Sequence, residues 1–360
     1  MSDISAPADP SRILEIGTGF WASKTLLSAV ELRLFTHLGE AGPSSGPEIA
    51  RGVGLAPRAT DDFLDALVAL HFLDREGDGT GARYRNSADS AVFLDEREPG
   101  YVGGLLEMLN ARLYGFWGGL TEALRTGLPQ SEIRHNGAPF FAELSRDPAR
   151  LDQFMHAMEA IQRGNFEALA SVVDFARYAT VCDVGGGAGQ LSMVLAARHS
   201  HLRCTTFDLP AVETIAQKAV SDAGLADRIS VESGDFFADP LPRADVVTMG
   251  NILHDWNLAR KRQLIRSAYE ALPEGGALVV VENLIDDARR ENVFGLLMSL
   301  NMLIEFGDAF DYTGGDFSRW CREIGFTDVE IVPLAGPASA GIARKSSDGP
   351  SAAGTPRRAG

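Results

Sequence analysis

Hydrophobic positions change their spacing along the chain and thereby separate a helical first half from a second half of alternating elements. In the first region, about 1–95, WASKTLLSAVELRLFTHL has apolar residues at helical spacing, and the helical patterns GPEIARGVG and PRATDDFLDALVALHFL follow it. The glycine-rich stretch DREGDGTGARYRNS then has the pattern of a hairpin. Three helices followed by a hairpin are the outline of a winged helix, which we expect over residues 1–95.

The middle region, about 96–175, is helical again and is rich in aromatic and methionine residues. Such side chains suit flat substrates, so we expect a helical linker that lines a substrate pocket. The candidate pocket residues are aromatic or methionine side chains and one amide: Tyr114, Trp117, Phe154, Met155, Met158, Met298, Asn301 and Met302. Because the same residues at helical spacing also form ordinary cores, only part of this set is expected to touch a substrate.

From residue 176 to residue 345, short β-rich runs alternate with helical segments. The runs are TVCDVGG, RCTTFDL, ISVESGDFF, DVVTMGNIL, ALVVVENL and TDVEIVPL. This alternation predicts an α/β fold with a doubly wound, mostly parallel sheet. The remaining residues, 346–360, are small, polar and proline-bearing, and we expect a disordered tail there.

Charge and cysteine content narrow the possible partners. The formal net charge of −16 and the absence of a long apolar run argue against nucleic-acid and membrane partners. Three widely separated cysteines without a CxxC pair indicate a reduced, cytoplasmic protein. Winged helices often bind DNA, so a ligand-sensing regulator is an alternative. Against it, residues 40–90 hold five arginines and nine acidic residues, whereas phosphate contacts need basic side chains.

The stretch VCDVGGGAGQ, residues 181–190, has the pattern of a nucleotide-binding turn between a strand and a helix. Gly185, Gly187 and Gly189 are spaced G-x-G-x-G, and the dinucleotide fingerprint would need a further glycine where Gln190 stands. This spacing disfavours NAD. Asp208, at the end of the next apolar run, lies where an acidic residue can accept hydrogen bonds from both ribose hydroxyls.

Further cofactor contacts are expected close to the ends of these runs. Asp183 precedes the glycines and could face a positive group, while Asp235 and Phe236 in SGDFF offer an acceptor and an aromatic face to an adenine. Leu209 and Asn251 complete the expected set. The similar stretch LEIGTGF, residues 14–20, has no strand before it, and we interpret it as the lead into a helix.

The motifs VCDVGGGAG, FDLP, GDFF and LHDW occur here in the order found in S-adenosylmethionine-dependent O-methyltransferases of the caffeate type. The chain resembles that family, which includes bacterial natural-product tailoring enzymes, over roughly residues 15–335. The resemblance implies a Rossmann-like catalytic domain, a winged-helix dimerisation domain, a homodimer and S-adenosylmethionine as cofactor. It also implies an aromatic small-molecule acceptor and a role in secondary metabolism.

Within this family, the histidine of LHDW is the general base, and the resemblance assigns that role to His254. Its position supports the assignment, because it follows a strand directly, at the edge where open α/β sheets bind ligands. The family's two acidic residues beside the base match Glu282 and Asp311, and the shorter Asp311 is expected to support the ring less than Glu282 does. The family often has Lys or Arg where Gly250 stands, which removes one cofactor contact.

Alternatives to methyl transfer to oxygen remain open at this stage. An N- or C-methyltransferase would share every cofactor residue, and relatives of the family have drifted to polyketide hydroxylation or decarboxylation. No metal is expected, because His199 and His201, the one closely spaced histidine pair, have no third ligand nearby in the sequence.

Overall fold

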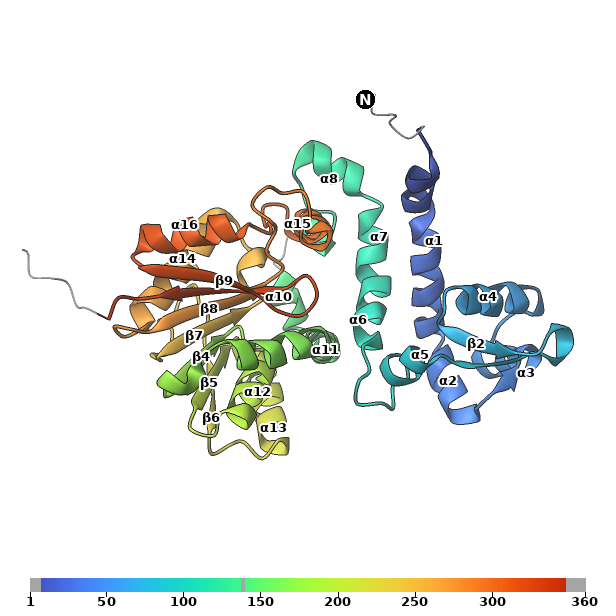
Figure 1. The fold of residues 1–360 in the computed structure, drawn as a ribbon, viewed down its shortest axis with the longest axis horizontal. Helices are drawn as coiled ribbons and strands as arrows, with labels where there is room; N and C mark the ends of the chain where they lie inside the picture. The colour runs from blue at the N-terminus through green and yellow to red at the C-terminus, as the bar shows by residue number, and fades with distance from the viewer. Residues whose placement is uncertain (1–7, 137–139, 348–360) are drawn as a thin grey trace, which may run out of the picture. The chain divides into compact units, whose positions relative to one another are not determined.

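The computed structural model describes residues 8–136 and 140–347, and the chain divides into two compact units, Met1–Gly115 and Phe116–Gly360 (Figure 1). The division falls inside the helical region predicted for 96–175. The predicted tail, 346–360, lies outside the described residues except for its first two positions.

The N-terminal unit has the predicted winged-helix outline. Its elements are α1 (Ser11–Glu31), α2 (Leu34–Ala41), β1 (Ser44–Ser45), α3 (Gly46–Val53), α4 (Pro57–Ala69), β2 (Leu73–Glu76), β3 (Arg83–Asn86), α5 (Ala88–Phe93), α6 (Gly103–Met108) and the π-helical turn η2 (Leu109–Leu113). The strands form a small sheet in the order β1-β3-β2. A capping box between Ser45 and Glu48 starts α3, and Pro57 starts α4. The stretch LEIGTGF, which we interpreted as the lead into a helix, lies inside α1 itself.

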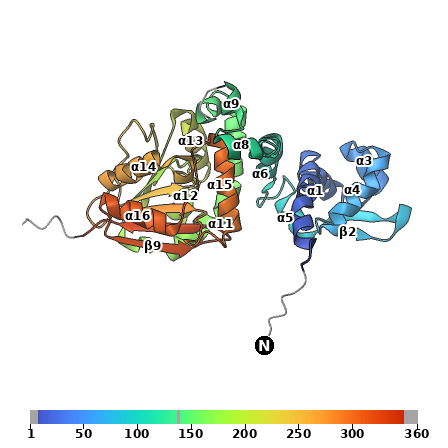
Figure 2. The ribbon, with the colours of Figure 1, turned by 90° about the horizontal axis from the view of Figure 1, so that it is seen from above.

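Helix α1 buries only its C-terminal part. In both ribbon views α1 runs beside α6 (Figures 1 and 2). Ala29 and Val30 pack into the core of the unit, around Phe35 and Leu64. The N-terminal half of α1 exposes large apolar side chains: Ile13, Leu14, Ile16, Phe20 and Trp21. This stretch is therefore an apolar helix surface that the unit itself leaves uncovered.

The C-terminal unit is built on a seven-stranded sheet, with α7 (Tyr114–Trp117) crossing the boundary between the units. Its helices are α8 (Leu120–Thr126), α9 (Glu132–Asn136), α10 (Phe140–Leu144), α11 (Pro148–Val172), α12 (Gln190–Arg198), α13 (Glu213–Asp222), α14 (Leu258–Ala271), α15 (Val293–Phe306) and α16 (Gly314–Ile324). Its strands are β4 (Thr180–Val184), β5 (Arg203–Asp208), β6 (Ile229–Ser233), β7 (Val246–Gly250), β8 (Ala277–Glu282), β9 (Asp328–Pro333) and β10 (Ser339–Arg344).

The strand order is β6-β5-β4-β7-β8-β10-β9, and the first five strands of this order are parallel. One core packs α14 and α16 against the sheet, and a second core packs α11, α12 and α13 against it. The predicted doubly wound, mostly parallel sheet is thus confirmed. Parallel strands end at one edge, so the segments after β4, β5, β7 and β8 are brought close together.

The sequence did not predict strand β10, which inserts antiparallel between β8 and β9. Its segment SAGIAR is made largely of small residues and lacks the β-branched run that marks the other strands. One of these residues is required by packing, because a Cβ on Gly341 would lie 2.7 Å from the ring of Phe317. The small side chains let α16 approach the sheet closely.

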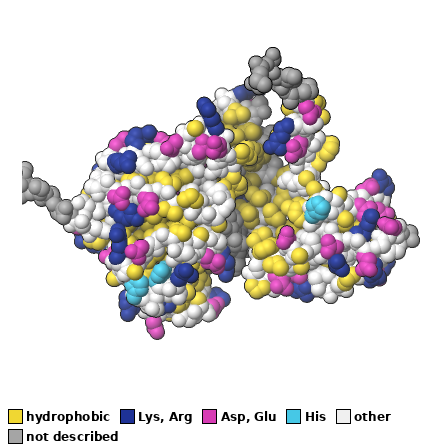
Figure 3. Space-filling view, in the orientation of Figure 1, with side chains coloured by type: hydrophobic (Ala, Val, Ile, Leu, Met, Phe, Trp, Pro, Cys, Tyr) yellow, Lys and Arg dark blue, Asp and Glu magenta, His cyan; other side chains and the backbone are white. Residues whose placement is uncertain are grey.

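Two surface features bear on the predicted partners. In the part of the chain that the structure describes, no helix combines the length and the apolar character needed to cross a membrane. The face shown in Figure 3 carries basic and acidic side chains interspersed over the C-terminal unit.

Candidate active site

The glycine loop, residues 185–189, joins β4 to α12 and depends on residues without side chains. Gly185, Gly187 and Gly189 all have positive φ, at 68°, 54° and 83°. A Cβ at Gly185 would lie 2.3 Å from the side chain of Ile252, and one at Gly186 would lie 2.2 Å from the hydroxyl of Thr206. The loop therefore has both the conformation and the close packing expected of a cradle for a nucleotide-like ligand.

Asp208 holds the glycine loop from the end of the neighbouring strand β5. Its carboxylate accepts hydrogen bonds from the backbone N–H of Gly187, at 2.8 Å, and of Leu209, at 2.7 Å. A narrow pocket beside it is lined by these residues together with Glu232 and Ser233 at the end of β6. Burial raises the pKa of Asp208, and the two backbone N–H groups oppose that rise.

Asp183 lies beneath the same loop and is almost fully buried, with 3% of its surface exposed. The hydroxyl of Thr248 on β7 donates to it at 2.8 Å, and a Cβ at Gly186 would lie 2.8 Å from its other oxygen. Burial raises its pKa to about 7; the Thr248 hydrogen bond opposes this, and the charge of Asp208 adds to it. A buried carboxylate of this kind favours a positive group near the loop.

The remaining predicted cofactor residues differ in exposure, contacts and backbone conformation. Asp235 is exposed, and its carboxylate accepts from the N–H of Phe237 within its own turn. Phe236 is half-buried and meets Trp256 edge-to-face, with ring centroids 6.0 Å apart. Asn251 follows β7 with a φ of 52°, a left-handed conformation that asparagine tolerates better than most residues. A Cβ at Gly250 would lie 3.1 Å from the ring of Phe166, so a larger side chain there would need this ring to move.

His254 lies in the histidine turn, residues 252–257, directly after β7. The side chain is 9% exposed, and its Nδ1 lies 3.4 Å from Oδ1 of Asp311. The residues after Asp311 are tied to the segment that follows β8, where the N–H of Ile285 donates to the carbonyl of Tyr312 and Ile285 forms an isolated parallel bridge with Thr313. The shorter aspartate thus does contact the imidazole.

Glu282, at the end of β8, contacts the backbone of the histidine turn rather than the ring. Its Oε1 accepts from the N–H of Leu253 at 2.9 Å and from the N–H of His254 at 3.3 Å. The expectation that Glu282 supports the ring more than Asp311 therefore disagrees with the geometry. Motif matching could not show this, because it places residues along the chain and not the direction of each carboxylate.

Two further residues of the site did not stand out in the sequence. Asp255, the neighbour of His254, places Oδ1 3.3 Å from the other ring nitrogen, Nε2. Lys261, on α14, is fully buried, and its ammonium donates to the carbonyl of Trp256. Asp255 is part of LHDW, so the motif contained the signal; Lys261 lies within a helical pattern that resembles any amphipathic helix.

The charges around His254 decide its protonation. Burial alone would lower the pKa of His254, but Asp255, Glu282 and Asp311 outweigh it and raise the pKa above its ordinary value. Burial raises the pKa of Glu282 and of Asp255, while the His254 charge opposes both shifts. The ring is therefore a stronger base than a free imidazole, held between carboxylates on both nitrogens.

Three of the predicted substrate residues lie together. Trp117 donates its indole N–H to the amide oxygen of Asn301 at 2.9 Å, and Met298 lies 4.0 Å from the amide nitrogen of Asn301. The amide nitrogen also donates to Glu305 at 2.9 Å, so much of its bonding capacity is already used. These three predicted residues form one cluster at the end of α7 and on α15.

The other predicted substrate residues lie elsewhere. Met155 has its sulfur 3.1 Å from the position of a Cβ on Gly187, and therefore lies against the glycine loop. Phe154 packs into a small cluster around Leu144 and Leu151, Met302 is buried, and Met158 is half-buried. Tyr114 belongs to the N-terminal unit, where its ring lies 5.3 Å from the ammonium of Lys24.

Comparison with known proteins decides the family. The sequence matches the O-methyltransferase domain over residues 117–327 and the O-methyltransferase dimerisation domain over residues 14–96. The chain belongs to the O-methyltransferase family. The resemblance inferred from the motifs is thereby confirmed, and S-adenosylmethionine is the cofactor of this O-methyltransferase.

The relatives include enzymes that act on different groups. The chain is 42% identical to the tetracenomycin polyketide synthesis 8-O-methyl transferase of Streptomyces glaucescens, with 93% of this chain and 97% of the relative covered. It is 35% identical to a 3-hydroxy-5-methyl-1-naphthoate 3-O-methyltransferase of Streptomyces sahachiroi, covering 92% and 94%. It is also 36% identical to an N,N-dimethyltransferase of Streptomyces rimosus, covering 89% and 92%.

Among solved structures, human N-acetylserotonin methyltransferase in complex with S-adenosylmethionine is similar, with a TM-score of 0.87 and 30% identity. The match covers 96% of this chain and all of that one. The glycine cradle, the Asp208 carboxylate and the buried Asp183 fit this cofactor: a loop for its amino-acid part, an acceptor for its ribose and a negative charge near its cationic groups.

The imidazole of His254 and the carboxylates of Glu282 and Asp311 also offer three ligand atoms within 4.8 Å of one another. The pair His199 and His201 offers less, because each Nε2 lies near a backbone carbonyl, that of Ala170 at 3.0 Å and that of Phe175 at 3.2 Å. The absence of a metal requirement stays a prediction.

Proposed function

We propose that this O-methyltransferase transfers a methyl group from S-adenosylmethionine to a phenolic hydroxyl of an aromatic secondary metabolite, with His254 as the general base. The observation that carries the proposal is the buried imidazole of His254 at the end of β7, with Asp311 3.4 Å from Nδ1. A buried histidine with an acidic partner on one nitrogen is the usual arrangement of a general base.

In this proposal S-adenosylmethionine supplies an electrophilic methyl group on a positively charged sulfur. His254 takes the hydroxyl proton at Nε2 while the acceptor oxygen forms its bond to the methyl carbon; the bond from that carbon to the sulfur would break in the same step, and the sulfur would leave as a neutral thioether. Asp311 holds the ring from the Nδ1 side, and Asp255 stabilises the imidazolium from the Nε2 side. Glu282 fixes the backbone of the turn, so the ring keeps its place at the strand end.

The carboxylates also make the proton transfer easier. A phenol of pKa about 10 and an imidazole of pKa about 6.5 differ by roughly 5 kcal/mol in proton affinity. The raised pKa of His254 narrows this difference. Because its pKa is raised, the His254 ring of the cofactor-free protein keeps its proton to higher pH than a free imidazole does. A positive charge beside the ring lowers this pKa and favours the neutral ring that can act as a base.

For cofactor binding, we propose that Asp208 accepts from the ribose hydroxyls, and that Asp235 and Phe236 lie toward the adenine. Leu209, Asn251, Gly185, Gly187 and Gly189 form the surrounding backbone. The bonds from Asp208 to the glycine loop support this proposal, because they place its carboxylate at the loop before any ligand binds.

The acceptor class rests on the relatives and on the cluster of Trp117, Met298 and Asn301 in the C-terminal unit. An aromatic face, a thioether and an amide next to one another suit a flat, oxygenated ring. The names of two relatives specify a polyketide and a naphthoate. We therefore propose an aromatic polyketide intermediate as the acceptor, and include Phe154, Met155, Met158, Met302 and Tyr114 as weaker candidates for contact with it.

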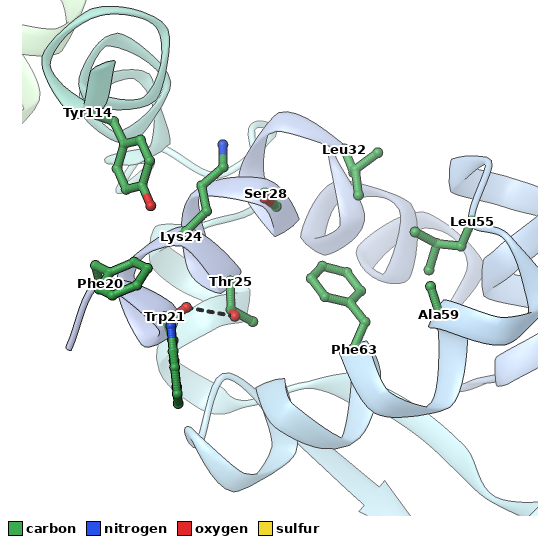
Figure 4. A pocket seen from close by; sticks show the side chains of 10 residues that line it. All are labelled: Phe20, Trp21, Lys24, Thr25, Ser28, Leu32, Leu55, Ala59, Phe63 and Tyr114. Carbon is green, nitrogen blue, oxygen red and sulfur yellow. Dashed lines mark hydrogen bonds between the residues drawn. The ribbon is translucent and has the colours of Figure 1, made fainter. Parts of the chain in front are cut away.

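We also propose that the protein is a homodimer assembled through the N-terminal unit. An open pocket of about 490 Å³ in that unit is lined by apolar residues of α1 and α4 together with Lys24 and Tyr114 (Figure 4). Trp21, one of the lining residues, is 64% exposed. A dimerisation domain with an uncovered apolar surface supports assembly through this surface. A cytoplasmic location rests on the cysteine content alone and stays a prediction.

A second candidate, N-methyl transfer, is favoured by the relative that is an N,N-dimethyltransferase. The experiment that separates the two is incubation with S-adenosylmethionine and a panel of naphthols, hydroxynaphthoates, polyketide phenols and matched aromatic amines, analysed by mass spectrometry. Our proposal predicts one added CH₂ on phenols and none on amines. Methylation of the amines alone would favour the second candidate. Loss of activity with a chelator would show that a metal is needed.

A further inference from the structure

Lys261 is a buried cation next to the site that the proposed chemistry does not use. It lies on α14, whose N-terminus is capped by Asn257, and none of its surface is exposed. Its ammonium donates to the carbonyl of Trp256, lies 3.9 Å from the centre of the Phe310 ring and 5.6 Å from that of Tyr312. Burying an ammonium is costly, so its presence calls for a compensating role.

No direct ion pair explains this burial. Within residues 8–136 and 140–347, no carboxylate oxygen lies within the 4.0 Å of Nζ that defines a salt bridge. The charges that act on the ammonium lie on several elements: Glu282 on β8, Asp255 in the histidine turn, and Asp308 and Asp311 in the segment after α15. Glu305 on α15 adds its charge at Asp255.

We propose that Lys261 is a positioning residue for this reaction: its buried ammonium balances the carboxylates around His254. The inference rests on the proposed role of His254 as base. A histidine among several uncompensated carboxylates would bind its proton too tightly, and the carboxylates would repel one another. One buried cation opposes both effects without contacting the acceptor.

Electrostatics fixes the direction of the effect. A positive charge weakens proton binding at every titrating group it faces, here His254, Glu282 and Asp255, and the Asp311 carboxylate is a further negative charge near the ammonium. Burial raises the pKa of Glu282 and of Asp255, and the Lys261 charge lowers the pKa of both. Burial lowers the pKa of Lys261, and the charges of the carboxylates raise it. Removing the ammonium therefore shifts all protonation steps of the cluster to higher pH, whichever residue dominates each step.

A structural role through the Trp256 carbonyl predicts something different. Loss of that hydrogen bond would displace the histidine turn and slow the reaction by the same factor at every pH. The two effects are separated by the shape of the pH profile and not by the size of the rate loss.

The test compares Lys261→Met with Lys345→Met. Lys345 is a matched control, because its ammonium also donates to backbone carbonyls, of Tyr269 and Leu272, and lies 4.4 Å from the ring centre of Tyr269. With a phenol methylated by the wild type, kcat/KM for the acceptor is measured from pH 5 to 10. We expect the acid-side limb of Lys261→Met to move up by on the order of one pH unit, with at most a threefold change on the alkaline plateau.

A second variant and a second readout keep the test decisive. Lys261→Gln removes the charge but keeps an N–H donor for the Trp256 carbonyl, and replaces Lys261→Met if that variant does not fold. In the cofactor-free protein, NMR titration of the His254 imidazole, assigned by its absence in His254→Ala, should show a higher pKa in either Lys261 variant and an unchanged pKa in Lys345→Met.

The inference would be overturned if a folded Lys261 variant kept both the acid-side limb of the kcat/KM profile and the His254 pKa of the wild type. Lys261 would then be a structural residue. If kcat/KM of the wild type showed no fall at low pH that His254→Ala abolishes, this would instead count against His254 as the base. The two failures are therefore distinguishable.

Discussion

The glycine loop and the histidine turn follow the neighbouring strands β4 and β7, yet they are stabilised in different ways. The loop is shaped by its backbone: glycines with positive φ, and the Asp208 carboxylate bonded to two N–H groups. The turn is shaped by buried charge: His254 between Asp255 and Asp311, with Glu282 bonded to its backbone. A site for binding can be rigid and local, whereas a site for proton transfer needs charges from several elements.

This comparison predicts where single substitutions act. Changes at the loop should alter cofactor affinity and leave the pH dependence intact. Changes at the turn should alter turnover and its pH dependence and leave cofactor affinity intact.

The largest effect on cofactor affinity is expected for Asp208→Ala. It removes the proposed ribose acceptor and also the two backbone hydrogen bonds that hold the loop, so cofactor affinity should fall by about 10²–10³-fold. Titration calorimetry with S-adenosylhomocysteine measures this, and Asp222→Ala is the control, because Asp222 is paired with Lys218 at the surface of α13. Unchanged affinity in Asp208→Ala would place the ribose elsewhere.

An intermediate effect is expected at the two acidic partners of the turn. Asp311→Asn removes the charge beside Nδ1 and should lower kcat by about 10–100-fold. Glu282→Gln should lower kcat by about tenfold or less, because an amide oxygen can still accept from the N–H of Leu253. Steady-state rates at saturating cofactor and acceptor compare them. A larger loss of kcat in Glu282→Gln than in Asp311→Asn, as the motif alone predicted, would contradict the ranking drawn from the distances to the ring.

The smallest effect is a gain in stability. The folded pKa of Asp183 is about 7, above its ordinary value of 3.8, so its ionisation opposes folding as pH rises through that interval. The full penalty, at most about 4 kcal/mol, is present only above pH 7. Asp183→Asn should therefore stabilise the cofactor-free protein by about 1–2 kcal/mol at pH 8 and by little at pH 5, while weakening cofactor binding.

Urea denaturation at the two pH values checks this prediction. A variant that is less stable than the wild type at pH 8 would mean that the carboxylate has a cationic partner within the protein itself.

The same contrast explains what the sequence could predict. The glycine loop, the Asp208 strand end and the position of His254 depend on residues close together in the chain, and local pattern was sufficient for them. The contact between Asp311 and the ring brings together segments far apart in the chain, where the N–H of Ile285 donates to the carbonyl of Tyr312, and no local pattern encodes this. Lys261 was missed for the same reason: only the fold turns that face of α14 toward the carboxylates.

The sequence pattern did not predict strand β10 or the unit to which Tyr114 belongs, for different reasons. The small residues of β10 suit the close approach of Phe317, a constraint that arises only once α16 packs on the sheet. Tyr114 stands at the boundary of the two units, and its aromatic neighbours in the sequence do not indicate which unit it joins.

The most direct test of the central claim is a comparison of wild type and His254→Ala on a series of phenolic acceptors of decreasing pKa. A general base matters most for weakly acidic hydroxyls, because acidic phenols are already ionised in solution. We predict a loss of about 10²–10⁴-fold in kcat/KM for a phenol of pKa about 10, and a progressively smaller loss as the phenol becomes more acidic. A loss of the same size for every acceptor, with the acid-side limb of the pH profile retained, would contradict the account and leave His254 a structural residue.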